Sequence, residues 1–121
     1  MSSLTKKRCI PCESGTPPIN KEEANKLLKE IPGWKIEELE SFRKQKGTDL
    51  AYSKISKEFN FKDFKKAVEF VNKVANIANK EGHHPDIYIF YSLVKLTLYT
   101  HAAGGLTEND FIVAAKVNAL S

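Results

Sequence analysis

The sequence predicts an α+β domain in which three helices pack on one face of a four-stranded antiparallel sheet, in the order α-β-β-α-β-β-α. Two observations predict this class. Three stretches repeat apolar residues at the spacing of a helix buried on one side, and β-rich runs stand in pairs between them. Strands that follow each other in pairs form antiparallel ribbons, and the helices between such pairs gather on one face of the sheet.

Length and composition predict a single soluble domain. The chain has 121 residues, of which 41% are hydrophobic and 28% are charged. It contains no apolar run near the roughly 20 residues that span a bilayer, and residues 1–8 lead into no apolar segment of the kind found in signal peptides. We therefore expect a cytoplasmic protein that does not contact membranes. The net charge of +4 comes from lysines spread along the chain, so we expect no nucleic acid partner.

Residues 1–19 are expected to form a flexible N-terminal tail, and residues 20–121 the folded domain. The tail contains Ser, Thr, Gly and the consecutive Pro17 and Pro18. It also holds both cysteines, as Cys9-x-x-Cys12. Such a pair is typical of a metal knuckle or a redox dithiol, but a closed zinc site needs four ligands and the sequence has no second pair. A structural role, redox chemistry and a metal site shared between subunits therefore stay open.

The first helix begins after Asn20, which can cap it together with Glu23 three residues later, and it ends at Pro32-Gly33. Its buried face is expected to carry Ala24, Leu27, Leu28 and Ile31. A strand over 34–39 should follow. After a charged connection over 43–49, a second strand should place Ile55, Phe59 and Phe61 on one face and pair with the first as an antiparallel ribbon.

A second helix is expected over 62–80. Seven apolar residues recur at helical spacing on its buried face: Phe64, Ala67, Val68, Val71, Val74, Ala75 and Ala78. Gly82 should end this helix, because glycine tolerates the left-handed conformation in which many helices terminate. The neighbouring His83 and His84 therefore lie at a junction between a helix and a strand.

Two short strands should follow, over 87–90 and 94–100. In the second, Val94, Leu96 and Leu98 share the core face, whereas Lys95, Thr97, Tyr99 and His101 share the other. A capping box of Thr107 and Asp110 opens a last helix, which carries Phe111, Ala114, Ala115 and Leu120. The sheet face without helices would be exposed in a monomer, which favours a homodimer or homotetramer.

The histidines are the residues with the strongest catalytic potential. An unperturbed imidazole has a pKa of about 6.5, so it can donate and accept a proton near neutral pH. In an extended segment His83 and His84 point to opposite faces, which disfavours joint binding of one metal ion, and Pro85 stiffens the segment. The H-E-x-x-H metal pattern is absent. We therefore expect no metal and prefer acid-base chemistry, while a structural or surface role stays open for each histidine.

Several motifs together resemble the pterin-4a-carbinolamine dehydratases, in particular the bacterial members. They are Glu81-Gly-His-His-Pro-Asp86, Thr97-Leu-Tyr-Thr-His101, Gly105-Leu-Thr-Glu-Asn-Asp110, Trp34 and Phe59-Asn-Phe-Lys-Asp-Phe64, and the match covers about residues 20–120. The resemblance implies a four-stranded α+β fold that assembles as dimers or tetramers. It also implies dehydration of 4a-hydroxytetrahydrobiopterin to the quinonoid dihydropterin. That hydro-lyase reaction recycles the cofactor of aromatic amino acid hydroxylases.

By the same resemblance, His83, His84 and His101 form the catalytic set, and which of them is acid and which is base stays open. Pterin is the substrate, so no cofactor is expected. The resemblance implies that the residues around the substrate are Gly82, Pro85, Tyr99, Thr100, Asp110 and Trp34. Among these, Asp110 would orient a histidine, and Trp34 would either form an apolar wall or simply pack in the core.

Two other functions compete with this hypothesis. Members of the family also resemble a dimerisation partner of a homeodomain transcription factor, so the chain could act as a protein-interaction or coactivator module. Such a module does not need all three histidines. A metal-dependent hydrolase is a third, weaker alternative.

Overall fold

The structure is a computed structural model, and it describes residues 3–10, 18–38, 53–100 and 103–120. Three α-helices and four strands follow one another in the predicted order, and a short 3-10 helix precedes them. Their bounds are η1 Ser3–Lys6, α1 Lys21–Leu28, β1 Lys35–Glu38, β2 Ser53–Asn60, α2 Phe64–Glu81, β3 Asp86–Phe90, β4 Leu93–Leu98 and α3 Glu108–Asn118. The predicted α+β class is confirmed.

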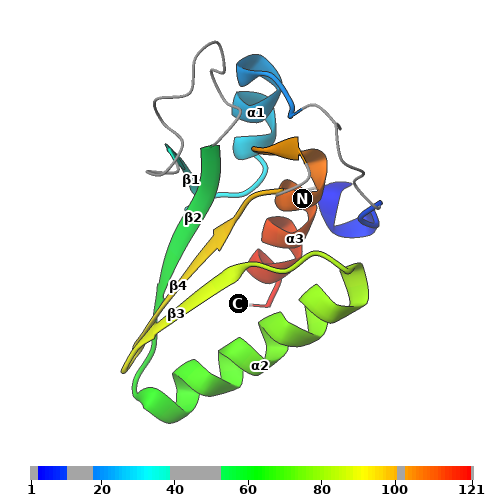
Figure 1. The fold of residues 1–121 in the computed structure, drawn as a ribbon. Coiled ribbons are helices and arrows are strands. Elements are labelled where there is room, and N and C mark those ends of the chain that lie inside the picture. The colour runs from blue at the N-terminus through cyan, green and yellow to red at the C-terminus, as the bar shows by residue number, and fades with distance from the viewer. Residues whose placement is uncertain (1–2, 11–17, 39–52, 101–102, 121) are drawn as a thin grey trace.

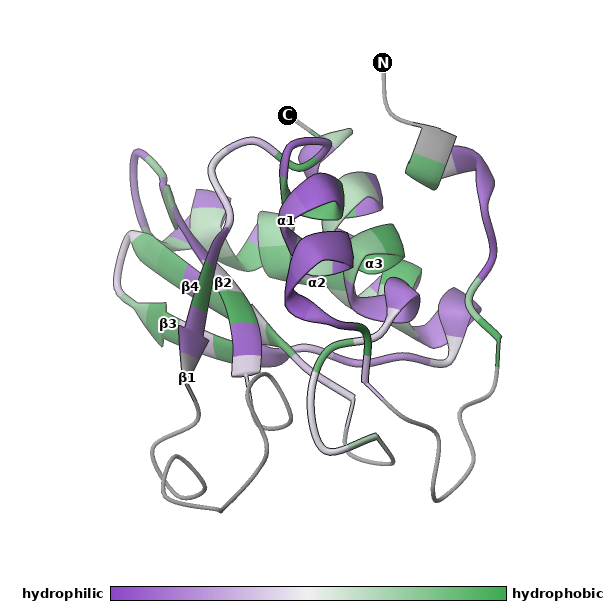
Figure 2. Ribbon diagram, turned by 90° about the horizontal axis from the view of Figure 1, so that it is seen from above, coloured by the Kyte–Doolittle hydropathy of each residue, from purple (hydrophilic) through white to green (hydrophobic). Residues whose placement is uncertain are grey.

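The four strands form one antiparallel sheet in the order β1-β2-β4-β3. Ile55 of β2 stands opposite both Ile36 of β1 and Leu98 of β4, so these side chains share a face. The three α-helices lie on that face, as Figures 1 and 2 show. Val94, Leu96 and Leu98, predicted to face the core, are at most 1% exposed.

The helix ends follow the local sequence. Asn20 caps α1 by accepting a hydrogen bond from the Glu23 N–H at 2.8 Å, as predicted. Asp63 caps α2 in the same way, through the Lys66 N–H at 2.9 Å. Gly82 ends α2 with a φ of 67°, the predicted left-handed conformation.

The buried face of α2 differs in part from the expected one. Phe64 is half-exposed, whereas Phe70, absent from the predicted set, is buried. The face that meets the sheet is centred on Ala67, Phe70, Val74 and Ala78, and Phe64 lies to one side of it in the first turn. Phe70 is drawn inward by aromatic contacts with Phe59 and Phe61, at centroid distances of 4.7 and 5.0 Å.

The last helix, α3, is the centre of the helical layer. Nearly all of its residues between Asn109 and Val117 are buried, because α2 and η1 both contact it in addition to the sheet side. Leu4 of η1 is 1% exposed and belongs to the hydrophobic core. Residues 3–10 of the segment expected to be a flexible tail are therefore packed against the domain, through an apolar side chain that local sequence patterns do not flag.

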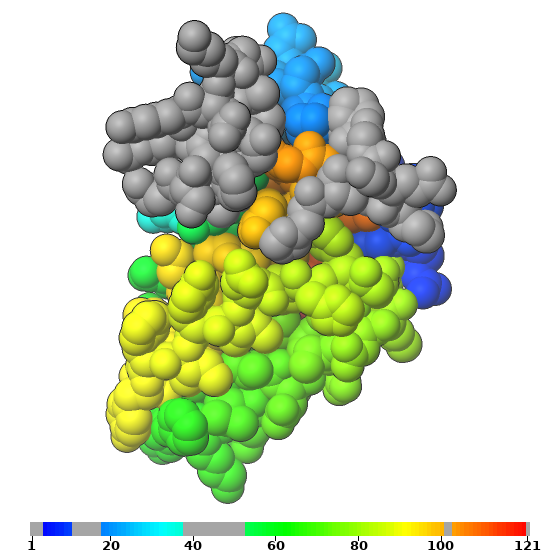
Figure 3. All heavy atoms as spheres, in the orientation of Figure 1, coloured from blue at the N-terminus to red at the C-terminus, as the bar shows by residue number. Residues whose placement is uncertain are grey.

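The opposite face of the sheet carries no helix, as predicted. The edge strand β3 and the turn after it expose Tyr88, Ile89, Phe90 and Tyr91 by 40–69%. In Figure 3, β3 and the turn after it belong to the yellow part of the surface, beside the green start of α2. No helix in the described part of the chain is long and apolar enough to cross a membrane.

Candidate active site

The junction between α2 and β3 positions the two adjacent histidines. The N–H groups of Gly82 and His83 both donate to the carbonyl of Ala78, at 2.9 and 3.2 Å, which closes the end of the helix. Asp86 then begins β3 after Pro85. His83 and His84 therefore lie in a short link whose two ends are held by a helix end and a sheet strand.

His83 is anchored by a buried carboxylate. Its Nε2 lies 2.6 Å from Oδ1 of Asp110, and its side chain is 13% exposed whereas that of Asp110 is fully buried. An ionised carboxylate can only accept a hydrogen bond, so Nε2 of His83 is the donor. The neutral ring then has its lone pair on Nδ1, which is the nitrogen able to take up a proton.

Asp110 is itself held rigidly at the start of α3. Its Oδ2 accepts hydrogen bonds from the Thr107 N–H and from Thr100 Oγ1, both at 2.9 Å. The hydroxyls of Thr100 and Thr107 lie 2.8 Å apart, so Thr107 donates to Thr100 while Thr100 donates to Asp110. The predicted capping box is thus confirmed, and the same carboxylate serves both the helix start and His83.

His84 takes a different direction. Its Nε2 lies 3.1 Å from Oδ1 of Asn79 in the last turn of α2, and the residue is exposed. The two imidazoles therefore diverge, as the extended geometry predicts. Asn79 was not among the predicted site residues. Its position one helical turn before the junction was the available signal.

Two predicted residues, His101 and Cys12, lie outside the described residues. Thr100, directly before His101, is buried and bonded to Asp110.

Tyr99 and Trp34 lie in different surroundings. Burial, the charge of Asp86 and nearby Tyr88 together raise the pKa of Tyr99, so Tyr99 is close to the start of β3. Trp34 is 5% exposed, its Nε1 donates to Oδ1 of Asn118 at 3.0 Å, and its ring meets Phe59 edge-on. These contacts favour core packing for Trp34 over a wall of the site.

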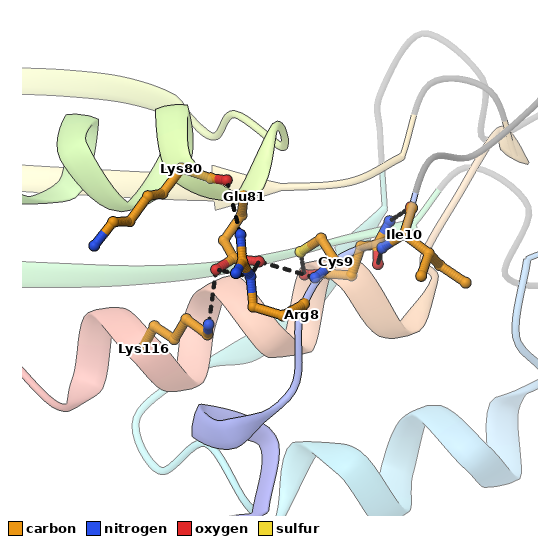
Figure 4. A network of polar contacts seen from close by, with 7 residues as sticks. Arg8, Cys9, Ile10, Lys80, Glu81 and Lys116 are labelled. Carbon is orange, nitrogen blue, oxygen red and sulfur yellow. Dashed lines mark hydrogen bonds and ion pairs between the residues drawn. The ribbon is translucent and has the colours of Figure 1, made fainter.

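The end of α2 carries a second polar cluster that the sequence did not reveal. Glu81, two residues before His83, accepts hydrogen bonds from Lys116 of α3 and from the backbone of Cys9 (Figure 4). Burial opposes the charge on Glu81, but these donors and Arg8 outweigh it and lower the pKa of Glu81 to about 2. Burial and the charge of Glu81 raise the pKa of Cys9 to about 12, so Cys9 stays a thiol.

Metal ligation finds no support in the described ranges. Among these residues, no group of three or more His, Cys, Asp or Glu side chains is placed to hold a metal ion. A histidine hydrogen-bonded to a buried carboxylate, with a second histidine beside it, is an arrangement suited to general acid-base catalysis.

The sequence matches the family model for pterin 4 alpha carbinolamine dehydratase over residues 17–120. The chain belongs to this family. A relative from Rubrobacter xylanophilus, named as a pterin-4-alpha-carbinolamine dehydratase, is 38% identical over 120 residues, which cover 99% of this chain and 100% of the relative. A relative of the same name from Nitrosomonas europaea is 44% identical over 117 residues, which cover 97% of this chain and 92% of the relative.

A solved structure agrees with this membership in a dehydratase family. The protein named transcriptional coactivator/pterin dehydratase from Brucella melitensis superposes with a TM-score of 0.68 at 34% identity. The match covers 85% of this chain and 97% of that chain. The family resemblance stated from the sequence is confirmed, and with it the assignment of the chain to an enzyme family of hydro-lyases.

Proposed function

We propose that this protein dehydrates 4a-hydroxytetrahydrobiopterin, or a closely related 4a-hydroxytetrahydropterin, to the quinonoid dihydropterin by histidine acid-base catalysis. The observation that carries the proposal is the hydrogen bond between His83 and the buried Asp110, in a chain of the dehydratase family. Three histidines supply the proton donors and acceptors that the reaction needs.

The reaction requires two proton transfers and no change of oxidation state. The lone pair of the ring nitrogen next to C4a forms a double bond to C4a while the bond from C4a to the hydroxyl oxygen breaks. An acid delivers a proton to that oxygen, which leaves as water, and a base removes the proton from the nitrogen. A positioned acid or base contributes about 10²- to 10⁴-fold to the rate.

His83 is the better base of the described pair. The Asp110 carboxylate accepts its Nε2–H at 2.6 Å, so Nδ1 takes the substrate proton and the carboxylate stabilises the imidazolium that forms. Asp110 acts through His83 and is a positioning residue, supported by Thr100 and Thr107. The acid toward the hydroxyl is then His84 or His101, and the other of the two is proposed to hold the substrate so that the acid can reach that hydroxyl.

The proposed substrate contacts follow the same region of the chain. Gly82 and Pro85 flank the histidine pair, and Tyr99 lies near the start of β3, so these three can border a planar pterin. Thr100 and Asp110 lie behind His83 and contribute through the hydrogen bonds that hold its ring in place. Trp34 is better explained as a core residue than as a substrate contact, because its indole is committed to Asn118 and Phe59.

In the cell we propose a cytoplasmic homodimer or homotetramer that recycles the pterin cofactor of an aromatic amino acid hydroxylase. Assembly is supported by the uncovered sheet face and by the exposed aromatic residues of the edge strand β3. The same exposed surface would serve the alternative function, a protein-interaction or coactivator module. The name of the Brucella melitensis protein includes the words transcriptional coactivator.

The test is a spectroscopic assay of quinonoid dihydropterin formation from synthetic 4a-hydroxytetrahydropterin. We expect the protein to accelerate the reaction, and we expect His84→Ala and His101→Ala to abolish that acceleration without changing the oligomeric state. Asn76→Ala, at an exposed position of α2, is the matched control and should remain active. No acceleration by the wild-type protein would favour the interaction module, and full turnover in either histidine variant would contradict the mechanism.

A further inference from the structure

An N-terminal arm, Arg8 to Ile10, bridges the two elements that hold the His83–Asp110 pair. Figure 4 shows it running between the end of α2, where Glu81 lies, and α3. It reaches each element through specific hydrogen bonds, to Glu81 across 72 positions of sequence and to Asn109 across 99.

On the side of α2, the arm binds the last turn. The Cys9 N–H donates to Glu81 Oε1 at 2.9 Å, and Arg8 pairs with the same carboxylate at 3.2 Å. Arg8 also reaches the Lys80 carbonyl at 3.4 Å. Lys116 of α3 donates to the other oxygen of Glu81 at 2.7 Å, so this carboxylate, 4% exposed, joins three segments of the chain.

On the side of α3, the arm binds the first turn. The side-chain amide of Asn109 pairs with the backbone of Ile10 at two points, accepting from its N–H at 3.1 Å and donating to its carbonyl at 2.6 Å. The Cys9 thiol lies 3.6 Å from the Asn109 carbonyl. Asn109 is 5% exposed and directly precedes Asp110.

We propose that the Arg8–Ile10 arm is a positioning clamp for catalysis, which holds the end of α2 and the start of α3 at the separation that the His83–Asp110 hydrogen bond requires. This inference rests on the proposed function for its catalytic consequence. The clamp acts two residues before His83, at Glu81, and one residue before Asp110, at Asn109. Its hydrogen bonds to Glu81 and Asn109 do not involve the paired side chains.

The short hydrogen bond explains why a clamp is needed. At 2.6 Å the His83–Asp110 contact leaves little room for relative movement of α2 and α3. A displacement of about 1 Å at a catalytic group can lower the rate by roughly 100-fold. Because the arm and Lys116 satisfy both oxygens of Glu81, α2 and α3 are coupled through a residue two positions before His83.

The test uses the full chain with two independent variants. Glu81→Gln keeps the shape of the side chain but removes its charge, and Asn109→Ala removes both bonds to Ile10. Glu108→Gln is the matched control, because it removes the charge from an exposed ion pair of 2.6 Å between Lys7 and α3 that does not involve α2. All measurements are made at a temperature where circular dichroism shows each variant to be fully folded.

Two readouts separate positioning from general stability. We expect kcat to fall roughly 10- to 100-fold in both variants while KM changes less than about twofold, because the substrate contacts are untouched. We also expect the His83 Nε2 proton, observed by NMR, to exchange with solvent at least about tenfold faster in both variants, because the bond to Asp110 is loosened. The control should match the wild type in both readouts.

The outcomes distinguish the clamp from the proposed function. If the wild-type protein does not dehydrate the pterin, the proposed function fails, yet proton exchange still reports on the clamp. Unchanged proton exchange in the folded Glu81→Gln and Asn109→Ala variants would overturn the clamp, and so would wild-type kcat in an active enzyme.

Discussion

Replacing Asp110 by asparagine would test the catalytic pair most directly. In the wild type, one oxygen of Asp110 accepts from His83 and the other from Thr100 and Thr107. Asparagine has one acceptor oxygen, which can keep the two bonds at the helix start. Its NH₂ group then faces His83 Nε2, so that nitrogen must accept and the proton moves to Nδ1. The nitrogen proposed to act as base is thereby blocked.

The structure allows the size of both effects to be worked out. A hydrogen bond to a charged group contributes about 1.5–3 kcal/mol and a neutral one about 0.5–1.5 kcal/mol, so neutralising the acceptor of two retained bonds costs roughly 2 kcal/mol. For a chain of this length, that loss lowers Tm by about 6–10 °C. Loss of the positioned base lowers kcat by about 10²- to 10⁴-fold, or about 2.7–5.5 kcal/mol of activation free energy.

The assay is dehydration of synthetic 4a-hydroxytetrahydropterin, run well below the Tm that circular dichroism gives for the variant. Asp63→Asn is the control, since Asp63 caps α2 through a single N–H and asparagine caps helices equally well. It should leave both Tm and kcat near the wild-type values. If folded Asp110→Asn keeps more than about a tenth of the wild-type kcat, the assignment of His83 as a base held by Asp110 is wrong.

Three further predictions concern stability. Gly33→Ala should cost more than about 2 kcal/mol in urea unfolding, because φ is 90° there. The added Cβ would also come within 2.7 Å of the end of the Lys57 side chain, which can move aside only by disturbing its hydrogen bonds to the Pro32 carbonyl and to Asn118. Gly82→Ala, with a φ of 67° and open space, should cost only about 1–2 kcal/mol. Equal losses would contradict this difference. The pKa of Glu81, about 2, lies below the unfolded value of about 4.3, so its charge stabilises the fold above pH 4.3 and this contribution is lost as the pH falls toward 2. That contribution is on the order of 1–3 kcal/mol, and Glu81→Gln should flatten the acid limb of stability against pH; an unaltered limb would argue against it. Ile55→Ala should cost about 2–5 kcal/mol in the same unfolding experiment, because Ile55 is fully buried, and a loss below 1 kcal/mol would mean that the core is less tightly packed than described.

Local sequence patterns predicted much of the fold because the forces behind them are local. The cap at Asn20 needs only a donor three residues later, and the stop at Gly82 needs only a residue that tolerates positive φ. The core face of β4 follows from the alternation of side chains along a strand. Each of these features depends on residues that are only a few positions apart in the sequence.

The docking of the N-terminal residues could not be predicted in this way. Leu4 enters the core by packing with the helical layer, and the Cys9 N–H bonds to Glu81 across 72 positions of sequence. A stretch with few apolar residues is typical of a tail when only its own composition is considered. Its partners come from the C-terminal half of the chain, which brings them near only after folding.

For the histidine pair too, the sequence predicted one part of the arrangement and the tertiary structure decided the other. That His83 and His84 follow a helix end and diverge could be deduced from the sequence, because a left-handed glycine ends a helix and an extended backbone alternates its side chains. The tertiary structure decided their partners. Asp110 reaches His83 from 27 positions away because α3 packs beside the end of α2, while His84 turns back to Asn79 within its own helix. The buried carboxylate that makes His83 a candidate base is therefore a product of helix packing.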